Sequence, residues 1–272
     1  MLGKLVDEKD ISRHAGANWW SGSDEIQLAK AARYYDTELL MIRRHDPEQA
    51  RREMTHYLRR GIPSLLCVHD WEHWVTVVKS EKGKYILLDS KDEAVLTILT
   101  WSQLKNTWVY YEQDEHDKKF YRTIYDFHPV VPKFRIRSKA SFSLAKAKYL
   151  RRPENRMLSK HWDHFIEDLL AICKPRTPLS ENVFSLGEFL RRHGEMIVDQ
   201  LAYWHGWINE RQASKLLRHM RFVADTYGLV IHEEEEKRAI AGITAILSLW
   251  AAAKFGVQPL YETNSAKHRR RR

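Results

Sequence analysis

Helical and strand-like hydrophobic periods occupy different parts of this chain, and this segregation limits the folds that it can adopt. Two early segments, 24–35 and 46–60, repeat apolar residues at helical spacing, and Asp46 followed by Pro47 is typical of a helix start. The next apolar runs are short and rich in β-branched and aromatic residues, as strands are. They cover 64–68, 74–78 and 84–88, and a Glu-Lys-Gly turn joins the last two into a predicted hairpin.

From about residue 159 the helical period returns, and it predicts an all-helical second domain. The expected helices cover 159–173, 185–205, 209–227 and 233–255. Between the halves, residues 113–158 are polar and contain prolines, which predicts an irregular connection. We therefore expect an α+β domain, a basic connector, a helical domain and a polybasic disordered tail. Their expected bounds are 1–125, 126–155, 156–260 and 261–272.

The basic balance of the chain is concentrated in two segments. The formal net charge is +9, with a pI of about 9.4. Residues 133–152 contain eight lysines or arginines and no acid, and 267–272 contain five. Either segment could bind a nucleic acid, although the sequence has no helix-turn-helix, zinc-finger or RNA-binding signature. The rest of the chain is slightly acidic, so the high pI does not by itself indicate a nucleic-acid-binding protein.

Membrane, secretory and cofactor signals are not apparent. The N-terminus is charged and offers no signal-peptide core, and the apolar run 239–253 is shorter than a spanning helix needs. Cys67 and Cys173 cannot form a disulfide scaffold, which fits a reducing compartment. We expect a cytoplasmic protein without a membrane span, and no cofactor, since phosphate and dinucleotide motifs are missing. His161, His164 and Asp168 share a helix face, but an exposed face is a simpler interpretation than a metal site.

The stretch 61–89 carries the chemical content of the sequence. His73 opens a predicted strand and Asp89 closes the next one, so the carboxylate can reach the imidazole across the hairpin. A base oriented by a carboxylate is half of a nucleophilic triad. With Gly61-Ile62-Pro63, His73-Trp74-Val75 and Trp108, this order resembles the papain-like peptidases that process bacteriocins at double-glycine leaders. The resemblance covers about 14–112 and implies a papain-like fold and a bacterial source.

The nucleophile of that family is missing. The family places a Cys-Gly-Pro at the start of a helix, and the resemblance maps this position to Ser23 or, if the glycine is matched, to Ser21. Asn18 is the nearest amide for the family's oxyanion glutamine. Trp19 and Trp20 precede the helix and could form the wall of a peptide-binding cleft, with Trp74 beside them. Most of the other tryptophans of the first half, Trp71, Trp101 and Trp108, are expected in the core.

Three functions fit these residues. The first is a degenerate peptidase that binds a peptide or protein without cleaving it, with the helical domain as a docking or dimerisation platform. The second is an active peptidase or amide hydrolase in which Ser23 or Ser21 attacks, His73 is the base and Asp89 orients it. The third is a nucleic-acid-associated protein that binds through the connector and tail. A purely structural His73–Asp89 pair is also compatible with the sequence.

Overall fold

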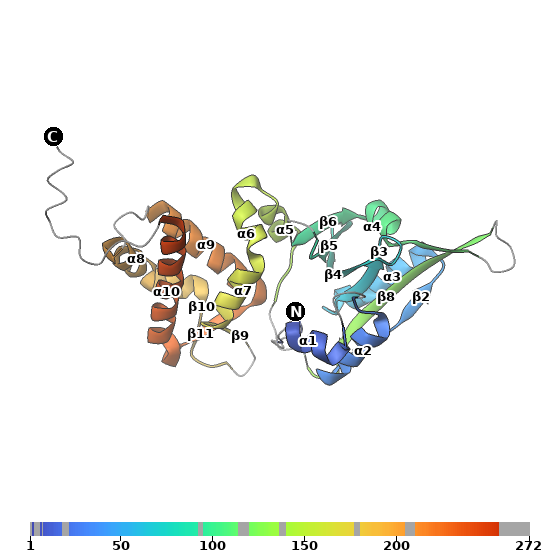
Figure 1. Cartoon of the computed structure of the whole chain (residues 1–272), viewed down its shortest axis with the longest axis horizontal. Coiled ribbons are helices and arrows are strands. Elements are labelled where there is room, and N and C mark those ends of the chain that lie inside the picture. The colour runs from blue at the N-terminus through green and yellow to red at the C-terminus, as the bar shows by residue number, and fades with distance from the viewer. Residues whose placement is uncertain are drawn as a thin grey trace. The chain divides into compact units, whose positions relative to one another are not determined.

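The computed structural model describes residues 2, 6, 8–17, 22–91, 95–113, 120–135, 140–176, 180–204 and 210–255. The chain divides into two compact units (Figure 1). The first comprises residues 1–163, 175–178 and 226–228, and the second comprises 164–174, 179–225 and 229–272.

An antiparallel eight-stranded sheet forms the centre of the first unit. Its main order is β1-β8-β3-β4-β5-β6, and β2 and β7 also pair with the long strand β8. The strands are β1 (Thr37–Leu39), β2 (Ile42–Arg44), β3 (Ser64–Val68), β4 (His73–Glu81), β5 (Lys84–Leu88), β6 (Leu96–Thr100), β7 (Tyr110–Gln113) and β8 (Tyr121–Pro132). The predicted hairpin is confirmed as β4–β5, and its turn residues Lys82 and Gly83 have φ values of 50° and 71°. Positive φ at both central positions matches the twist of a hairpin.

Several helices of the first unit begin at side-chain caps. Asp24 caps α2 and forms a reciprocal capping box with Gln27, and Asp46 caps α3 with Pro47 in its first turn. The sequence also predicts a short helix at 102–108 with Ser102 as its cap, whereas the observed helix begins at Trp101 and its cap is Thr100. The helices are α1 (Glu8–Ala15), α2 (Glu25–Tyr34), α3 (Pro47–Arg59), α4 (Trp101–Trp108), α5 (Leu144–Leu150) and α6 (Arg156–Lys160), with the 3-10 turn η1 (Pro153–Asn155).

One face of the sheet carries the core. Alternate residues of β3, β4 and β5 point to the same face, where they pack against α3 and α4. This core contains Met54, Leu66, Val77, Trp108 and Phe127, all of them almost completely buried. The tryptophan prediction holds for Trp108, whereas Trp71 is 37% exposed and lies outside the core.

The expected irregular connection is wrong for much of its length. Residues 121–132 form β8, which pairs with four other strands, and Ile124 and Phe127 are completely buried. In the sequence of β8, Asp126, His128 and two prolines interrupt the alternation of apolar and polar residues that marks a strand. The sequence therefore gives no clear strand period there. The expected connector 126–155 therefore begins inside a central strand and includes α5, which buries Leu144, Ala147 and Leu150.

The second unit is mostly helical but not all-α, which corrects the predicted fold class. Short strands form an additional sheet of order β10-β11-β9. The apolar runs Val183–Ser185 and Leu229–His232 are only a few residues long and adjoin helices, so a helical pattern conceals them. The elements are α7 (Trp162–Leu170), which begins at the end of the first unit, β9 (Lys174–Pro175), β10 (Val183–Ser185), α8 (Leu186–Trp204), α9 (Glu210–Tyr227), β11 (Leu229–His232), η2 (Glu233–Glu235) and α10 (Glu236–Phe255).

The apolar run 239–253 lies within α10. Ala239, Ile243, Leu247 and Ala251 form a stripe at a spacing of four residues and are almost fully buried. This stripe explains the run as one side of a packed helix. In the described part of the chain, no helix has the length and apolar character required to cross a membrane.

Candidate functional site

His73 and Asp89 lie together at the end of the β4–β5 hairpin. His73 Nε2 lies 2.7 Å from Asp89 Oδ1 and donates a hydrogen bond to the carboxylate. The imidazole is 8% exposed, and the same Asp89 oxygen accepts the backbone N–H of Lys91. The contact expected from the sequence is therefore present. A carboxylate on one ring nitrogen fixes the tautomer and orientation of a histidine, whether its role is chemical or structural.

The N-terminus of α2 is the place where the resemblance puts a nucleophile, and a carboxylate caps it. Asp24 Oδ1 accepts the backbone N–H of Gln27 at 2.7 Å, and Gln27 Oε1 accepts the backbone N–H of Asp24 at 3.1 Å. Glu25 adds a second negative charge in the first turn. The helix dipole is thus already matched by acidic side chains, and one of the free N–H groups of the helix end is occupied.

Ser23 precedes this cap and is joined to the sheet through its backbone. Trp74 Nε1 donates a hydrogen bond of 2.9 Å to the Ser23 carbonyl, and the indole packs edge-on against His128. Among the described residues, no hydrogen bond connects the Ser23 hydroxyl with His73. The other proposed site residues, Asn18, Trp19, Trp20 and Ser21, lie outside the described residues.

Neither cysteine is suited to replace the missing nucleophile. Burial raises the pKa of the Cys67 thiol to about 11, although a backbone hydrogen bond from His73 acts in the opposite direction. Burial raises the pKa of Cys173 to about 12. A thiol needs a lowered pKa to supply thiolate at neutral pH, so both are structural cysteines.

Sequence reasoning missed a buried histidine near the Trp74 indole. His128 in β8 is 5% exposed, and its Nδ1 has no hydrogen-bond partner within the described residues. Desolvation lowers the pKa of this imidazole, while the nearby carboxylates of Asp126 and Glu25 act against that shift. Since β8 was expected to be irregular, no strand alternation was available to place His128 beside Trp74.

Sequence reasoning also missed an aromatic group in the loop that precedes His73. Trp71 stacks on Tyr110 with ring centroids 3.9 Å apart and planes inclined by 12°, and the Arg43 guanidinium lies 5.5 Å from the Trp71 ring centroid. Arg43 makes a bidentate bond with Asp126 at 2.9 and 2.7 Å. The only signal in the sequence was the position of Trp71 two residues before His73.

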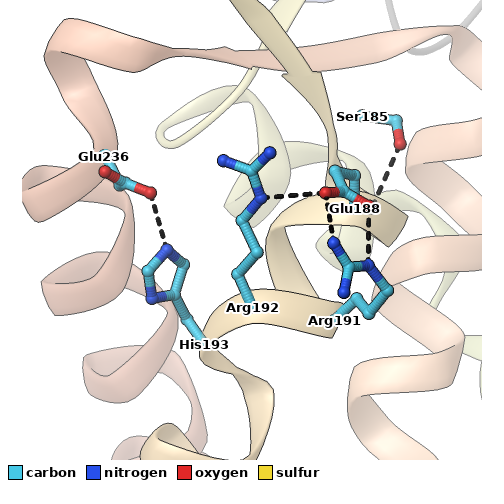
Figure 2. A network of polar contacts seen from close by, with 6 residues as sticks. All are labelled: Ser185, Glu188, Arg191, Arg192, His193 and Glu236. Carbon is cyan, nitrogen blue, oxygen red and sulfur yellow. Dashed lines mark hydrogen bonds and ion pairs between the residues drawn. The ribbon is translucent and has the colours of Figure 1, made fainter.

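The second unit contains a polar network of its own (Figure 2). Glu188 accepts hydrogen bonds from both Arg191 and Arg192, and these bonds lower the pKa of its carboxyl to about 2. His193 Nε2 lies 2.6 Å from Glu236 Oε1 and joins α8 to α10. These are side-chain links along and between helices. Within the described residues, no group of three or more histidine, cysteine or acidic side chains is arranged to hold a metal ion.

A groove lies between α8 and α10 beyond this network. Its volume is about 440 Å³. The walls combine apolar and polar side chains and comprise Met196, Ile197, Gln200, Ile240, Ala241, Thr244, Ala245 and Ser248. Large apolar side chains are also exposed on these helices, with Tyr203 at 80% and Leu249 at 72%.

Comparison with known proteins gives a distant structural similarity. No protein-family model matches the sequence, and no curated protein matches it. Among solved structures, the chain is similar to the peptidase domain of Streptococcus ComA, a bi-functional ABC transporter involved in a quorum-sensing pathway. The two share 15% identity with a TM-score of 0.34, over 48% of this chain and 82% of that chain.

Proposed function

We propose that the first unit is a catalytically degenerate papain-like module that recognises a peptide or protein without cleaving it. The observation that carries the proposal is the capping of α2 by Asp24 directly after Ser23. In an active site of this type, the positive end of the helix stabilises the nucleophile. Here Asp24 and Glu25 supply negative charge at that end, which disfavours a second anion beside them.

A serine hydroxyl would face a further difficulty at position 23. It is a much weaker acid than a thiol, so it requires a base in hydrogen-bond contact and preorganised oxyanion donors. No such contact with His73 is formed by the Ser23 hydroxyl in the described part of the chain. The proposal therefore assigns His73 and Asp89 to the shape and polarity of a binding cleft.

The active-hydrolase alternative is supported by one observation, the 2.7 Å contact between His73 and Asp89. A fluorophosphonate probe separates the alternatives. We expect the full chain to show no adduct on Ser23 or Ser21 by mass spectrometry. His56→Ala, a change at an exposed histidine, is the control. The hydrolase would be established instead if an adduct formed, was lost with His73→Ala and was kept with His56→Ala.

Recognition itself is tested by selecting a displayed library of short peptides on the immobilised full chain. We expect enriched peptides that are recovered intact and lost with His73→Ala, whereas His56→Ala keeps them. Failure to enrich any peptide would contradict the binding proposal. Recovery of cleaved peptides would contradict the assignment as a degenerate enzyme.

For the second unit, we propose contact with a second copy of the chain through α8 and α10. The exposed Tyr203 and Leu249 belong to the same two helices as the groove, and a two-fold contact needs projecting and hollowed parts on one surface. Sedimentation velocity should show a concentration-dependent dimer that Leu249→Lys disrupts. A monomer at all concentrations would contradict this part of the proposal.

The nucleic-acid alternative is supported by the exposed basic residues around α5. The helix buries Leu144 and Leu150, while Lys148, Arg151 and Arg152 are exposed. If this surface binds nucleic acid, affinity should fall steeply with salt and decrease when Arg151 and Arg152 are replaced by glutamine. Binding that is insensitive to both changes would exclude this alternative.

A further inference from the structure

The loop between β3 and β4 presents a restrained aromatic side chain, Trp71, which lies two residues before His73 in the sequence. Trp71 is 37% exposed although it stacks on Tyr110 and lies beside Arg43. Arg43 is held in turn by its bidentate bond to Asp126. The indole is therefore restrained by two neighbours while part of it remains accessible.

The backbone of this loop is strained, although its residues are exposed. His69, Asp70 and Trp71 have consecutive φ values of 55°, 56° and 66°. The left-handed region is unfavourable for residues with a Cβ atom, and a tryptophan there is uncommon. The conformation is held by the Trp71–Tyr110 stack and by the His69 N–H, which donates to the Thr107 carbonyl at 2.9 Å. Strain maintained in this way is typical of ligand-binding positions.

Carboxylates outnumber cationic side chains around Trp71, although Arg122 faces Glu112 across the β7–β8 pairing. Arg43 donates hydrogen bonds to Asp126, which raise the pKa of the guanidinium, and the negative charges of Glu112 and Glu25 act in the same direction. Glu112 follows Tyr110 by two residues in β7, so both side chains lie on the same face of that strand. Asp70 and Glu72 flank Trp71 in the loop and are exposed. The ion pairs formed within the described residues include none for these four carboxylates, and Asp126 already neutralises Arg43.

We propose that Trp71, Tyr110, Glu25, Glu72 and Glu112 form a binding surface for an extended cationic peptide. The proposal of this Trp71 surface rests on the proposed function, because it names the class of peptide that the first unit recognises. Lysine and arginine side chains match it because their charged ends interact with carboxylates while their aliphatic stems pack on aromatic rings. The charge complementarity excludes acidic peptides.

Fluorescence anisotropy with the full chain tests the proposal. The probe is a short labelled peptide with three arginines, and the matched probes replace the arginines by glutamine or by glutamate. We expect the arginine probe alone to bind, with an affinity that decreases as salt increases. Glu25→Gln, Glu72→Gln and Glu112→Gln together should weaken it on the order of tenfold, whereas Glu38→Gln, an exposed change on β1, should leave it unchanged.

Trp71→Gly separates a binding role from a structural one. Glycine accepts the left-handed backbone, so this variant removes the indole while relieving strain. We expect a folded protein by circular dichroism and a loss of arginine-probe binding on the order of tenfold. Equal binding of the arginine and glutamine probes would overturn the proposal, as would full affinity in both the Trp71→Gly and the triple variants.

The two proposals can fail separately. Enrichment of neutral peptides in the displayed library, with no binding of the arginine probe, would overturn the cationic assignment and leave peptide recognition supported. A library that yields no peptide, together with no binding of the arginine probe, would overturn both. A third outcome is that the chain associates with itself as its concentration rises and that the arginine probe displaces this association. The Trp71 surface would then bind the basic 267–272 tail of a second copy, and its assignment to a separate peptide would be overturned.

Discussion

At the scale of single residues, the His73–Asp89 pair shows what local sequence can predict. A residue that opens one strand and a residue that closes the next are brought together by hairpin geometry, so their contact followed from chain order alone. His128 required knowledge of the whole sheet, because its neighbour Trp74 is more than fifty residues away in sequence. The position of the Trp71 side chain depends on a left-handed backbone conformation, which residue propensities do not predict for tryptophan.

Removing Asp89 should destabilise the first unit. Asp89→Ala leaves the buried His73 Nε2 without its acceptor, and an unpaired buried polar group costs about 1–3 kcal/mol. Chemical denaturation should show this loss, whereas Asp89→Asn should retain more stability because its carbonyl still accepts. Glu38→Ala, an exposed control, should change little. Equal stability of Asp89→Ala and the wild type would show that the pair makes no structural contribution.

His219 should make the second unit sensitive to acid. It is 4% exposed with Nε2 unpaired in the described structure, and burial, followed by the charges of Lys215 and Arg218, lowers its pKa to about 4. The unfolded state takes up a proton near pH 6.5, so the free energy of unfolding should decrease as the pH falls from 6.5 to 4. The shift corresponds to a loss of about 3 kcal/mol.

Urea titrations at several pH values measure this dependence. His219→Phe should flatten the curve between pH 6.5 and 4, because it removes the titrating group and keeps an aromatic ring beside Phe165. Met196→Leu, a change at an exposed side chain without a titrating group, is the control in the same unit and should leave the curve as in the wild type. A curve unchanged by His219→Phe would assign the acid sensitivity to other groups.

At the scale of elements, the start of α3 and the turn of the β4–β5 hairpin were predicted correctly, whereas the cap of α4 and the long-range strands were not. Asp46-Pro47 and the Lys82-Gly83 turn mark boundaries that need no tertiary information. β8 carries polar residues and prolines within its length, and its strand conformation depends on partners from distant parts of the chain. The short strands of the second unit lack enough residues to establish a period.

The capping box of α2 can be tested separately from any chemistry. Asp24→Ala should reduce stability by about 1 kcal/mol, because Gln27 loses its acceptor at the helix end. Asp24→Asn should restore most of this loss, since Asn is also a good cap. Asp46→Ala at α3 gives a matched comparison, and thermal unfolding measures all three. No difference between Asp24→Ala and Asp24→Asn would contradict the capping role.

At the scale of the whole molecule, the sequence indicated a mixed first half and a helical second half, and the structure has two compact units. The fold class was easier to predict than the function, because helical and strand periods can be read from the sequence. Function depends on details that fold does not determine. In the proposed function, those details are the acidic cap of α2 and Ser23, to which the resemblance maps the cysteine of the family.

The central claim, that this helix terminus no longer supports a nucleophile, can be measured with a thiol at position 23. Burial of Cys67 and Cys173 raises both their pKa values, so alkylation of Ser23→Cys reports mainly the new thiol. The pH dependence of its iodoacetamide reaction should give a thiol pKa of about 8.5 or higher, unaffected by His73→Ala. A thiol pKa below about 7 that rises with His73→Ala would show a working thiolate–imidazolium site and contradict the account.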